Sequence, residues 1–281
     1  MQMMKALEPL PRGVYCGAIG VVRPGGHATF SVAIRTVTRR GDNVTCGIGS
    51  GITADATAAA EWQEWQHKRG FLERASQGFK LLETLRLQDG EFHLLEAHLQ
   101  RLAHAAAHFA YPFDEQRVRG ALQALAVLHD KDLWRVRLQL DSSGTPQAHA
   151  YEQKPTASPV QLVLAAIPFE ASSSEFTRFK TTRRRHYEAF AAADPAVFDT
   201  LLYNPRGELT ECTRGNIAVL LEGQWLTPAQ HCGLLAGIGR AHYLARGELK
   251  EAVITLADLP RAQAFAFINS LRGWIDAQLQ P

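Results

Sequence analysis

The amino-acid sequence predicts an α+β fold, because strand-like and helix-like patterns are mixed along the chain. Alternating or continuous apolar runs rich in β-branched residues occur at 14–22, 30–37 and 160–167. A helical stripe, with apolar residues three and four positions apart, consists of Leu95, Leu99, Leu102, Ala106 and Phe109. The 281 residues are enough for about two domains, each with its own core.

The first 70 residues read as strands followed by a helix. The runs 14–22 and 30–37, separated by Pro24-Gly25-Gly26, predict a hairpin, and the glycine-dense run 44–52 predicts a strand or a loop. Asp55 or Thr57 can cap the helix that follows.

The next hundred residues mix both patterns. The runs 79–87 and 91–99 flank the turn Asp89-Gly90 and predict a second hairpin that leads into the helical stripe. A further helix is expected over 115–129. Strands are expected over 134–141, ended by a turn at 142–144, and over 160–167.

The last 110 residues contain four more strand-like runs, at 198–204, 216–223, 251–256 and 264–269. Between them we expect a turn at 204–207, a loop at Thr227-Pro228 and a short helix that begins after 233–240. The serine-rich stretch 171–174 is a candidate boundary inside this region.

Composition excludes several classes of protein. A net charge of +2 argues against nucleic acid or an anionic membrane as the main partner, so a small molecule is expected. The four cysteines lack a C-x-x-C spacing and are expected to be free, buried thiols. The longest apolar run, 160–169, is about half of a membrane span, and the amino terminus lacks an apolar signal core. We expect a soluble cytoplasmic protein.

Motif spacing alone indicates little chemistry. The run GIGSGI at 47–52 lacks the third glycine and the acidic residue of a dinucleotide loop, so its glycines more simply let backbone amides approach an anion or another chain. Glu61 and Glu64 lie on one helical face and are either ligands of a divalent cation or two solvated carboxylates. By spacing alone, Lys180 and Glu211 would be ordinary solvated residues.

Six segments change this interpretation. They are FKLLETLR, LLEAHLQRL, RFKTTRRRHYE, LLYNPRGELTECTRGNIAV, LTPAQHCGLLAGIGRA and FINSLRGW, in that order over about 200 residues. Together they resemble the fold type IV pyridoxal phosphate enzymes, which include branched-chain aminotransferases, and within them the aminodeoxychorismate lyases. The resemblance implies two α/β subdomains, at 70–170 and 171–281, the cofactor pyridoxal 5′-phosphate and a homodimer.

The resemblance also implies roles for eight residues and no metal. Lys180 matches the lysine that binds the cofactor covalently, Glu211 the carboxylate that faces the pyridine nitrogen, and Arg101 the arginine that holds the phosphate. The others are Ile238 and Gly239, whose amides would bind the phosphate, Tyr187 near the phenolic oxygen, and Asn269 and Ser270 near the phosphate. Burial and the cations at 183–185 could lower the pKa of Lys180, which must be neutral for part of the cycle.

Residues 7–68 resemble a different family. The segments LEPLPRGVYCGAIG, FSVAIRT, CGIGSGITADAT and EWQEWQHK are similar to the carboxyl-terminal end of chorismate-binding enzymes such as aminodeoxychorismate synthase component I. The resemblance implies that Arg35, Gly49 and Gly51 lie near the chorismate carboxylates, with Glu61 and Glu64 on the magnesium side. Residues 1–69 are then a remnant of a domain several times longer.

The remnant suggests a synthase–lyase fusion. Because the chain opens in mid-motif at Met1, we expect expression from an internal methionine or a misassigned start. The lyase half lacks the first strands of its family, and residues 14–52 are expected to cover the sheet edge that those strands would occupy. A glutamine amidotransferase would be a partner of the intact synthase.

The combined expectation is a lyase that converts 4-amino-4-deoxychorismate to 4-aminobenzoate and pyruvate, a step of folate biosynthesis. Two alternatives stay open. A branched-chain or D-amino acid aminotransferase would share Lys180, Glu211 and Arg101. A non-catalytic chorismate-binding remnant on an inert scaffold would bind no cofactor.

Overall fold

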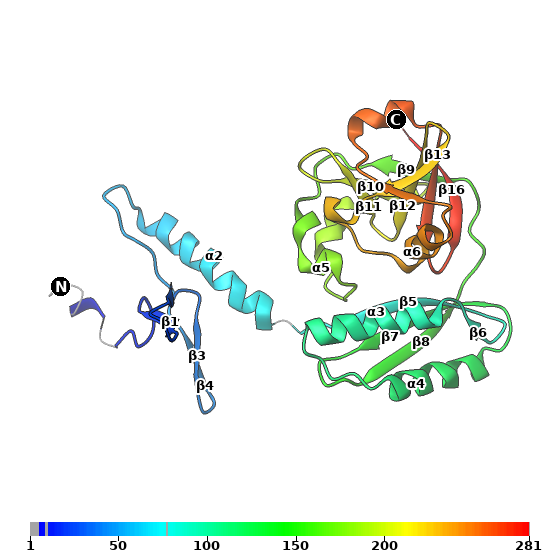
Figure 1. Cartoon of the computed structure of the whole chain (residues 1–281). Helices are drawn as coiled ribbons and strands as arrows, with labels where there is room; N and C mark the ends of the chain where they lie inside the picture. The colour runs from blue at the N-terminus through cyan, green and yellow to red at the C-terminus, as the bar shows by residue number, and fades with distance from the viewer. Residues whose placement is uncertain (1–5, 9–10, 77, 281) are drawn as a thin grey trace. The chain divides into compact units, whose positions relative to one another are not determined.

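A computed structural model describes residues 6–8, 11–76 and 78–280 of the chain. The chain divides into two compact units, Met1–Gly78 and Phe79–Pro281 (Figure 1). The residues at 1–4, on which the expectation of a truncated start depends, lie outside the described residues, as do Pro9 and Leu10.

The first unit consists of two hairpins and a helix. Strand β1 (Ala18–Val22) pairs with β2 (Ala28–Val32), and β3 (Val37–Arg40) pairs with β4 (Asn43–Cys46), both antiparallel; α2 covers Ala58–Ser76. The first hairpin confirms the prediction, but its strands are shorter than expected. Cys16 and Arg35 have φ of 61° and 50°, which interrupts the extended backbone outside β1 and β2.

This unit buries little of its apolar surface. All residues of β1 and β2 are exposed. Among the residues of this unit whose burial the structure describes, Ala33 alone is buried. Thr57 rather than Asp55 caps α2, since the Thr57 hydroxyl accepts from the amide of Ala60 at 3.3 Å. The helix continues to Ser76, past the expected domain limit at residue 69.

The second unit contains a four-stranded antiparallel sheet of order β6-β5-β7-β8. Its strands are β5 (Leu81–Gln88), β6 (Glu91–Phe92), β7 (Leu133–Leu140) and β8 (Pro146–Glu152). Asp89 and Gly90 both have positive φ, as a tight hairpin turn requires, which confirms the predicted turn. Strand β8 was not predicted, because it is an edge strand of mixed polar residues with no buried side chain.

Two helices pack on this sheet. They are α3 (Leu95–His108), which contacts β5, and α4 (Glu115–Leu128), which contacts β8. The predicted stripe is confirmed: Leu99, Leu102 and Ala106 are buried in one core with the sheet, and Leu95 and Phe109 pack at its margin. In α4, Val118 and Leu122 enter the same core.

The larger sheet has eight strands in the order β11-β10-β9-β16-β15-β12-β13-β14. They are β9 (Val160–Leu164), β10 (Asp199–Tyr203), β11 (Leu209–Cys212), β12 (Asn216–Leu221), β13 (Gln224–Pro228), β14 (Lys250–Ala252), β15 (Ala264–Asn269) and β16 (Gly273–Leu279). Between them lie the short helices η1 (Glu170–Ser173), α5 (Glu175–Arg178), η2 (Arg185–Phe190), η3 (Gln230–Cys232) and η4 (Leu256–Arg261), and α6 (Ile238–Ala245).

Several expectations for this region are corrected. Strand β9 pairs with β10 and β16, so that residues 160–164, expected in the small subdomain, belong to the larger sheet. Thr227-Pro228 ends β13 and is not a loop. The short helix α6 begins at Ile238, inside the 233–240 segment, because Gly237 supplies an extended N-cap there. The serine-rich stretch folds into η1, with Ser172 buried.

The mixed helix and strand content confirms the α+β class. Within the described residues, no helix has both the length and the apolar character to cross a membrane. All four cysteines are free, as expected, but only Cys212 and Cys232 are buried. Cys16, just before β1, is exposed, and Cys46 is half-buried, contrary to expectation.

Candidate active site

The second unit holds a cavity of about 470 Å³ that residues of both sheets line. Seven of the eight predicted site residues line it: Arg101, Lys180, Tyr187, Glu211, Ile238, Asn269 and Ser270. Gly239 is the eighth, and it packs directly behind the lining, where a Cβ would lie 2.6 Å from the carbonyl carbon of Asn269. The structure thus brings together residues from distant parts of the sequence around one pocket.

Lys180 follows α5 and is held by the start of β5. The amide of Leu82 donates to the Lys180 carbonyl at 3.0 Å, and the amide of Thr182 donates to the Lys80 carbonyl at 2.9 Å. Burial, together with the positive charges of Arg184 and Arg101, lowers the pKa of the Lys180 amine to about 7. Of the three cations expected at 183–185, Arg184 lowers the pKa of Lys180. The amine is therefore partly neutral at physiological pH.

Glu211 is buried on β11 and accepts two hydrogen bonds. The Tyr187 hydroxyl donates to its Oε1 at 2.7 Å, and the Leu235 amide donates to its Oε2 at 3.1 Å. Burial raises the pKa of Glu211 to about 7, although both hydrogen bonds favour the ionised form. This carboxyl is therefore poised to share or hold a proton inside the pocket.

Arg101 on α3 is oriented by a buried carboxylate on β5. Its Nε and Nη2 donate to the two Glu83 oxygens at 2.8 and 2.6 Å, and His98 Nδ1 lies 2.7 Å from Oε2. Burial alone would raise the pKa of Glu83, but Arg101 and His98 lower it to about 2. Arg101 Nη1 also donates to the Ala236 carbonyl at 3.3 Å, which brings the guanidinium to the loop before α6.

The loop before α6 approaches the sheet too closely for side chains. A Cβ on Gly237 would lie 1.9 Å from Asn216 Oδ1, and Asn216 Nδ2 donates to the Leu235 carbonyl at 3.0 Å. The amides of Ile238 and Gly239 begin the helix and have no partner within it, which favours an anion at this end. Arg101 reaches the same loop, so that these three residues form a candidate anion-binding corner.

The turn between β15 and β16 completes the wall of the pocket. Asn269 Oδ1 accepts from the Arg272 amide at 2.8 Å, and its Nδ2 donates to the Arg214 carbonyl at 3.3 Å. The hydroxyl of Ser270 contacts the Thr84 carbonyl at 3.5 Å, so this turn reaches β5 of the smaller sheet.

Sequence reasoning did not single out three residues of this site: Glu83, His98 and Arg272. For Glu83 a signal existed, since it is an acid on the face of β5 that otherwise carries Leu81, Leu85 and Leu87. For the others, nothing in the local sequence separates them from surface residues.

In the first unit, a smaller cavity of about 220 Å³ is lined by Arg35 and Gly49, with Tyr15 and Lys68 among the other lining residues. Glu61 accepts a hydrogen bond from Ser50, and Glu64 Oε1 lies 2.6 Å from Lys68 Nζ. Both carboxylates therefore have protein partners. In the part of the chain that the structure describes, no cluster of three or more His, Cys, Asp or Glu side chains could hold a metal ion.

Comparison with known proteins separates the two units. Residues 80–279 match the model of the family described as amino-transferase class IV. A Schizosaccharomyces pombe protein named "Putative aminodeoxychorismate lyase" is 31% identical over 201 residues, which cover 68% of this chain and 86% of that protein. A crystal structure from Mesorhizobium loti, titled "Putative amino-acid aminotransferase", is 36% identical with a TM-score of 0.67, over 72% of this chain and all of the other.

Residues 1–74 match the model of the chorismate binding enzyme family. Anthranilate synthase component 1 of Neisseria meningitidis is 36% identical over 77 residues, which are 27% of this chain. The chain spans only 16% of the length of that synthase, so this region is a fragment of the family's domain.

The family match also bears on the cofactor. The class IV fold occurs with its cofactor in a "hypothetical aminotransferase" of Mycobacterium tuberculosis in the PLP-bound form, which is 22% identical with a TM-score of 0.61 over 73% of this chain and 82% of the other. Pyridoxal phosphate is the cofactor of this family, as the sequence predicts. With a family match over residues 80–279 and a cavity lined from both sheets of that region, the chain belongs to the class IV aminotransferases and carries a chorismate-binding fragment at its amino terminus.

Proposed function

We propose that residues 79–281 convert 4-amino-4-deoxychorismate to 4-aminobenzoate and pyruvate with pyridoxal 5′-phosphate. The observation that carries the choice of reaction is the presence, in one chain, of a class IV region similar to a lyase relative and a chorismate-binding fragment. The reaction balances without water or an oxidant, because the proton lost from the ring carbon is matched by the one that the departing enolpyruvate gains.

The pocket fits the cofactor on three counts. Lys180 offers an amine of lowered pKa, Glu211 offers a buried carboxyl, and the anion-binding corner of Arg101, Ile238 and Gly239 suits a phosphate. The backbone at Gly237 and Gly239 lies too close to its neighbours for a side chain, which leaves the helix amides accessible to an anion.

Each residue then has a defined task. When bound, the cofactor supplies an electron sink for the carbanion formed at the amine-bearing carbon. Lys180 Nζ removes the proton from that carbon as a general base. Glu211 holds a proton at the pyridine nitrogen, and Tyr187 orients Glu211 through its 2.7 Å hydrogen bond. Asn269 and Ser270 support the phosphate end of the pocket. The ring becomes aromatic when the enolpyruvyl group leaves, and this gain of aromaticity drives the reaction forward.

A class IV aminotransferase is the second candidate function. The 36% identity to the Mesorhizobium loti aminotransferase, over the whole of that chain, favours it. The test is to incubate the purified holoenzyme with aminodeoxychorismate and to follow 4-aminobenzoate fluorescence and pyruvate together. Equimolar product supports the lyase. Amino transfer to 2-oxoglutarate without 4-aminobenzoate would establish the aminotransferase, and a protein that never binds cofactor would establish the inert remnant.

The proposal includes a cytoplasmic homodimer that acts in folate biosynthesis. A glutamine amidotransferase belongs only to the intact synthase from which the amino-terminal fragment derives. Size-exclusion chromatography with light scattering tests the dimer, which we expect with or without the cofactor.

Replacing Arg101 with alanine weakens cofactor retention about ten- to a hundredfold, because a charge-assisted hydrogen bond to phosphate contributes roughly 1.5–3 kcal/mol. Fluorescence titration of the cofactor-free protein measures the dissociation constant. Since the substitution also leaves Glu83 without its cation, a thermal melt accompanies the titration. Arg117→Ala on the exposed part of α4 is the control. Equal affinity in the Arg101→Ala protein would exclude the role.

The rate of cofactor uptake by the cofactor-free protein rises with pH and then levels off near about pH 8. Only the neutral amine of Lys180 attacks the cofactor's aldehyde carbon, and with a pKa of about 7 its neutral fraction increases about tenfold between about pH 6 and pH 8. Stopped-flow absorbance at several pH values measures the rate. A rate that keeps rising to about pH 10, the ordinary lysine pKa, would contradict the lowered value.

The amino-terminal fragment makes no aminodeoxychorismate from chorismate, with or without magnesium and ammonium. Glu61 and Glu64 already have protein partners, and two carboxylates on one helix leave Mg²⁺ largely hydrated. The measurement is 4-aminobenzoate formation by the coupled lyase half. Adding a complete synthase should restore product and serves as the control. Robust product without that synthase would show that the fragment is catalytic.

A further inference from the structure

The pocket carries far more positive than negative charge. Its lining includes one carboxylate, Glu211, and six arginines: Arg101, Arg135, Arg137, Arg184, Arg214 and Arg272. Glu83 pairs with Arg101, which the proposed function assigns to the cofactor phosphate, but these groups do not account for the other five arginines. The surplus indicates a ligand that carries negative charge in addition to the cofactor phosphate. Such a ligand needs a guanidinium that is not already paired with a protein carboxylate.

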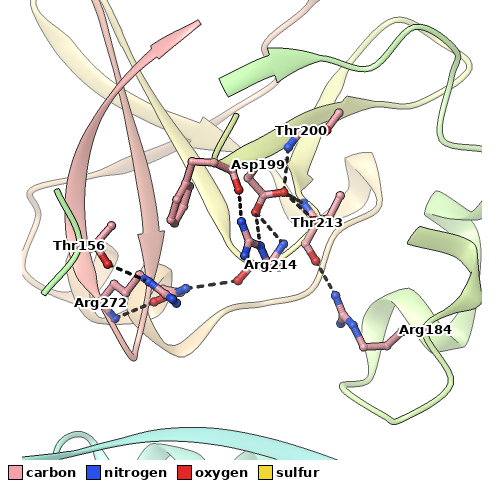
Figure 2. A network of polar contacts seen from close by, with 9 residues as sticks. Thr156, Arg184, Asp199, Thr200, Thr213, Arg214 and Arg272 are labelled. Atoms are coloured by element: carbon pink, nitrogen blue, oxygen red, sulfur yellow. Dashed lines mark hydrogen bonds and ion pairs between the residues drawn. The ribbon is translucent and has the colours of Figure 1, made fainter. Parts of the chain in front are cut away.

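Arg214 is already neutralised by a buried acid. Asp199 Oδ2 accepts from the Arg214 amide at 3.1 Å and lies 3.4 Å from its Nε, while Oδ1 accepts from Thr213 Oγ1 at 2.6 Å (Figure 2). Arg214 also donates to the Phe198 carbonyl. This side chain is therefore committed to holding the loop after β11 against β10.

The remaining arginines differ in burial. Arg184 donates to the Thr213 carbonyl and lies over the Tyr187 ring. Arg135 and Arg137 on β7 are exposed, where water and salt weaken their interaction with a ligand. Arg272 is partly buried, and among the described residues no carboxylate lies within ion-pair distance of it.

Arg272 is nevertheless held in place. Its Nε donates to Thr156 Oγ1 at 3.0 Å, its amide donates to Asn269 Oδ1 at 2.8 Å, and its guanidinium lies 5.7 Å from the centre of the Phe198 ring. Figure 2 shows the chain of contacts from Thr156 through Arg272 to the Arg214 loop. These contacts use one guanidinium nitrogen and leave the two Nη groups, which form the end suited to a carboxylate.

The same turn links this guanidinium to the cofactor end of the pocket. Residues 269–272 carry Asn269 and Ser270, which contact the Arg214 loop and β5, and Arg272 two positions later. A carboxylate held by Arg272 would therefore keep a constant place relative to the cofactor. Burial and the nearby charges of Arg214 and Arg135 lower the pKa of Arg272, and Asp199, which pairs with Arg214, offsets this only in part.

We propose that Arg272 binds a carboxylate of the substrate through its Nη groups and thereby selects dicarboxylates over monocarboxylates. This inference rests on the proposed function, whose substrate carries two carboxylates, and it assigns Arg272 as a specificity-determining residue. It requires only the binding of an anion, with no added step in the reaction.

The test compares Arg272→Gln with the parent holoenzyme. The KM for aminodeoxychorismate rises about 10- to 100-fold, kcat changes by less than about threefold, and the visible spectrum of the bound cofactor is unchanged. Arg272→Lys, which keeps the charge without the planar fork, recovers part of the loss. Arg117→Gln on α4 is the matched control and behaves like the parent. A KM that stays within about twofold in Arg272→Gln would overturn the proposal.

A second probe separates this inference from the proposed function. Isophthalate, a benzene dicarboxylate, and benzoate are titrated into the holoenzyme while the cofactor absorbance is followed. The parent binds isophthalate more tightly than benzoate, and Arg272→Gln loses that preference. If the parent makes no 4-aminobenzoate but still prefers isophthalate through Arg272, the lyase assignment fails and the carboxylate site stands. If 4-aminobenzoate forms but neither probe responds to Arg272→Gln, the inference fails and the lyase stands.

Discussion

Lys180→Ala yields a protein that folds normally but retains no covalent cofactor and loses at least about 1,000-fold in kcat. Two functions disappear together, because Lys180 both binds the cofactor and moves the proton at the reacting carbon, and a positioned general base alone contributes about 10²–10⁴-fold. The fold should tolerate the change. The local backbone is held by hydrogen bonds between 80–82 and 180–182, which do not involve the Lys180 side chain.

Borohydride reduction of the parent holoenzyme, followed by peptide mapping, identifies the modified lysine. We expect the label on Lys180 in the parent and no label in Lys180→Ala. Lys154→Ala, which changes an exposed lysine, is the matched control and keeps both label and activity. Label on Lys154 or Lys250 in the parent would refute the assignment.

Glu211→Gln lowers kcat about 10- to 1,000-fold with little change in KM. Removing a negative charge next to the pyridine nitrogen lowers the pKa of that nitrogen by about 1–3 units, so the protonated fraction falls by the same factor. The glutamine keeps the size of the side chain and can still accept from the Tyr187 hydroxyl or the Leu235 amide. The loss therefore reports the charge more than the packing.

Steady-state kinetics and the visible spectrum of the holoenzyme measure the effect. Glu211→Asp, which keeps the charge on a shorter side chain, should retain more activity than Glu211→Gln. Glu222→Gln, at an exposed turn, controls for the loss of one negative charge. A Glu211→Gln enzyme as fast as the parent would exclude the carboxylate as the partner of the ring nitrogen.

Local sequence patterns predicted some elements of the second unit and missed others. In 79–281, the stripe on α3 and the hairpin at Asp89-Gly90 were predicted correctly, because each depends on neighbours a few residues away. The edge strand β8 and the terminal strand β16 were not predicted. Strand β8 buries none of its side chains, and β16 has its place from pairing with β15 and β9, not from its own pattern.

By itself, the sequence determined the α+β class and the order of most strands and helices, and it predicted Lys180 and Glu211 as site residues, since each lies in a distinctive local segment. Only the tertiary structure decided the electrostatic setting of the pocket. Glu83 reaches Arg101 from another element, Thr156 reaches Arg272 across 116 positions of the chain, and Asp199 neutralises Arg214 in the wall of the pocket. The physical reason is that charge pairing and burial depend on distances in space. Two arginines in similar local sequences can therefore have opposite roles, one neutralised and one free to bind a ligand.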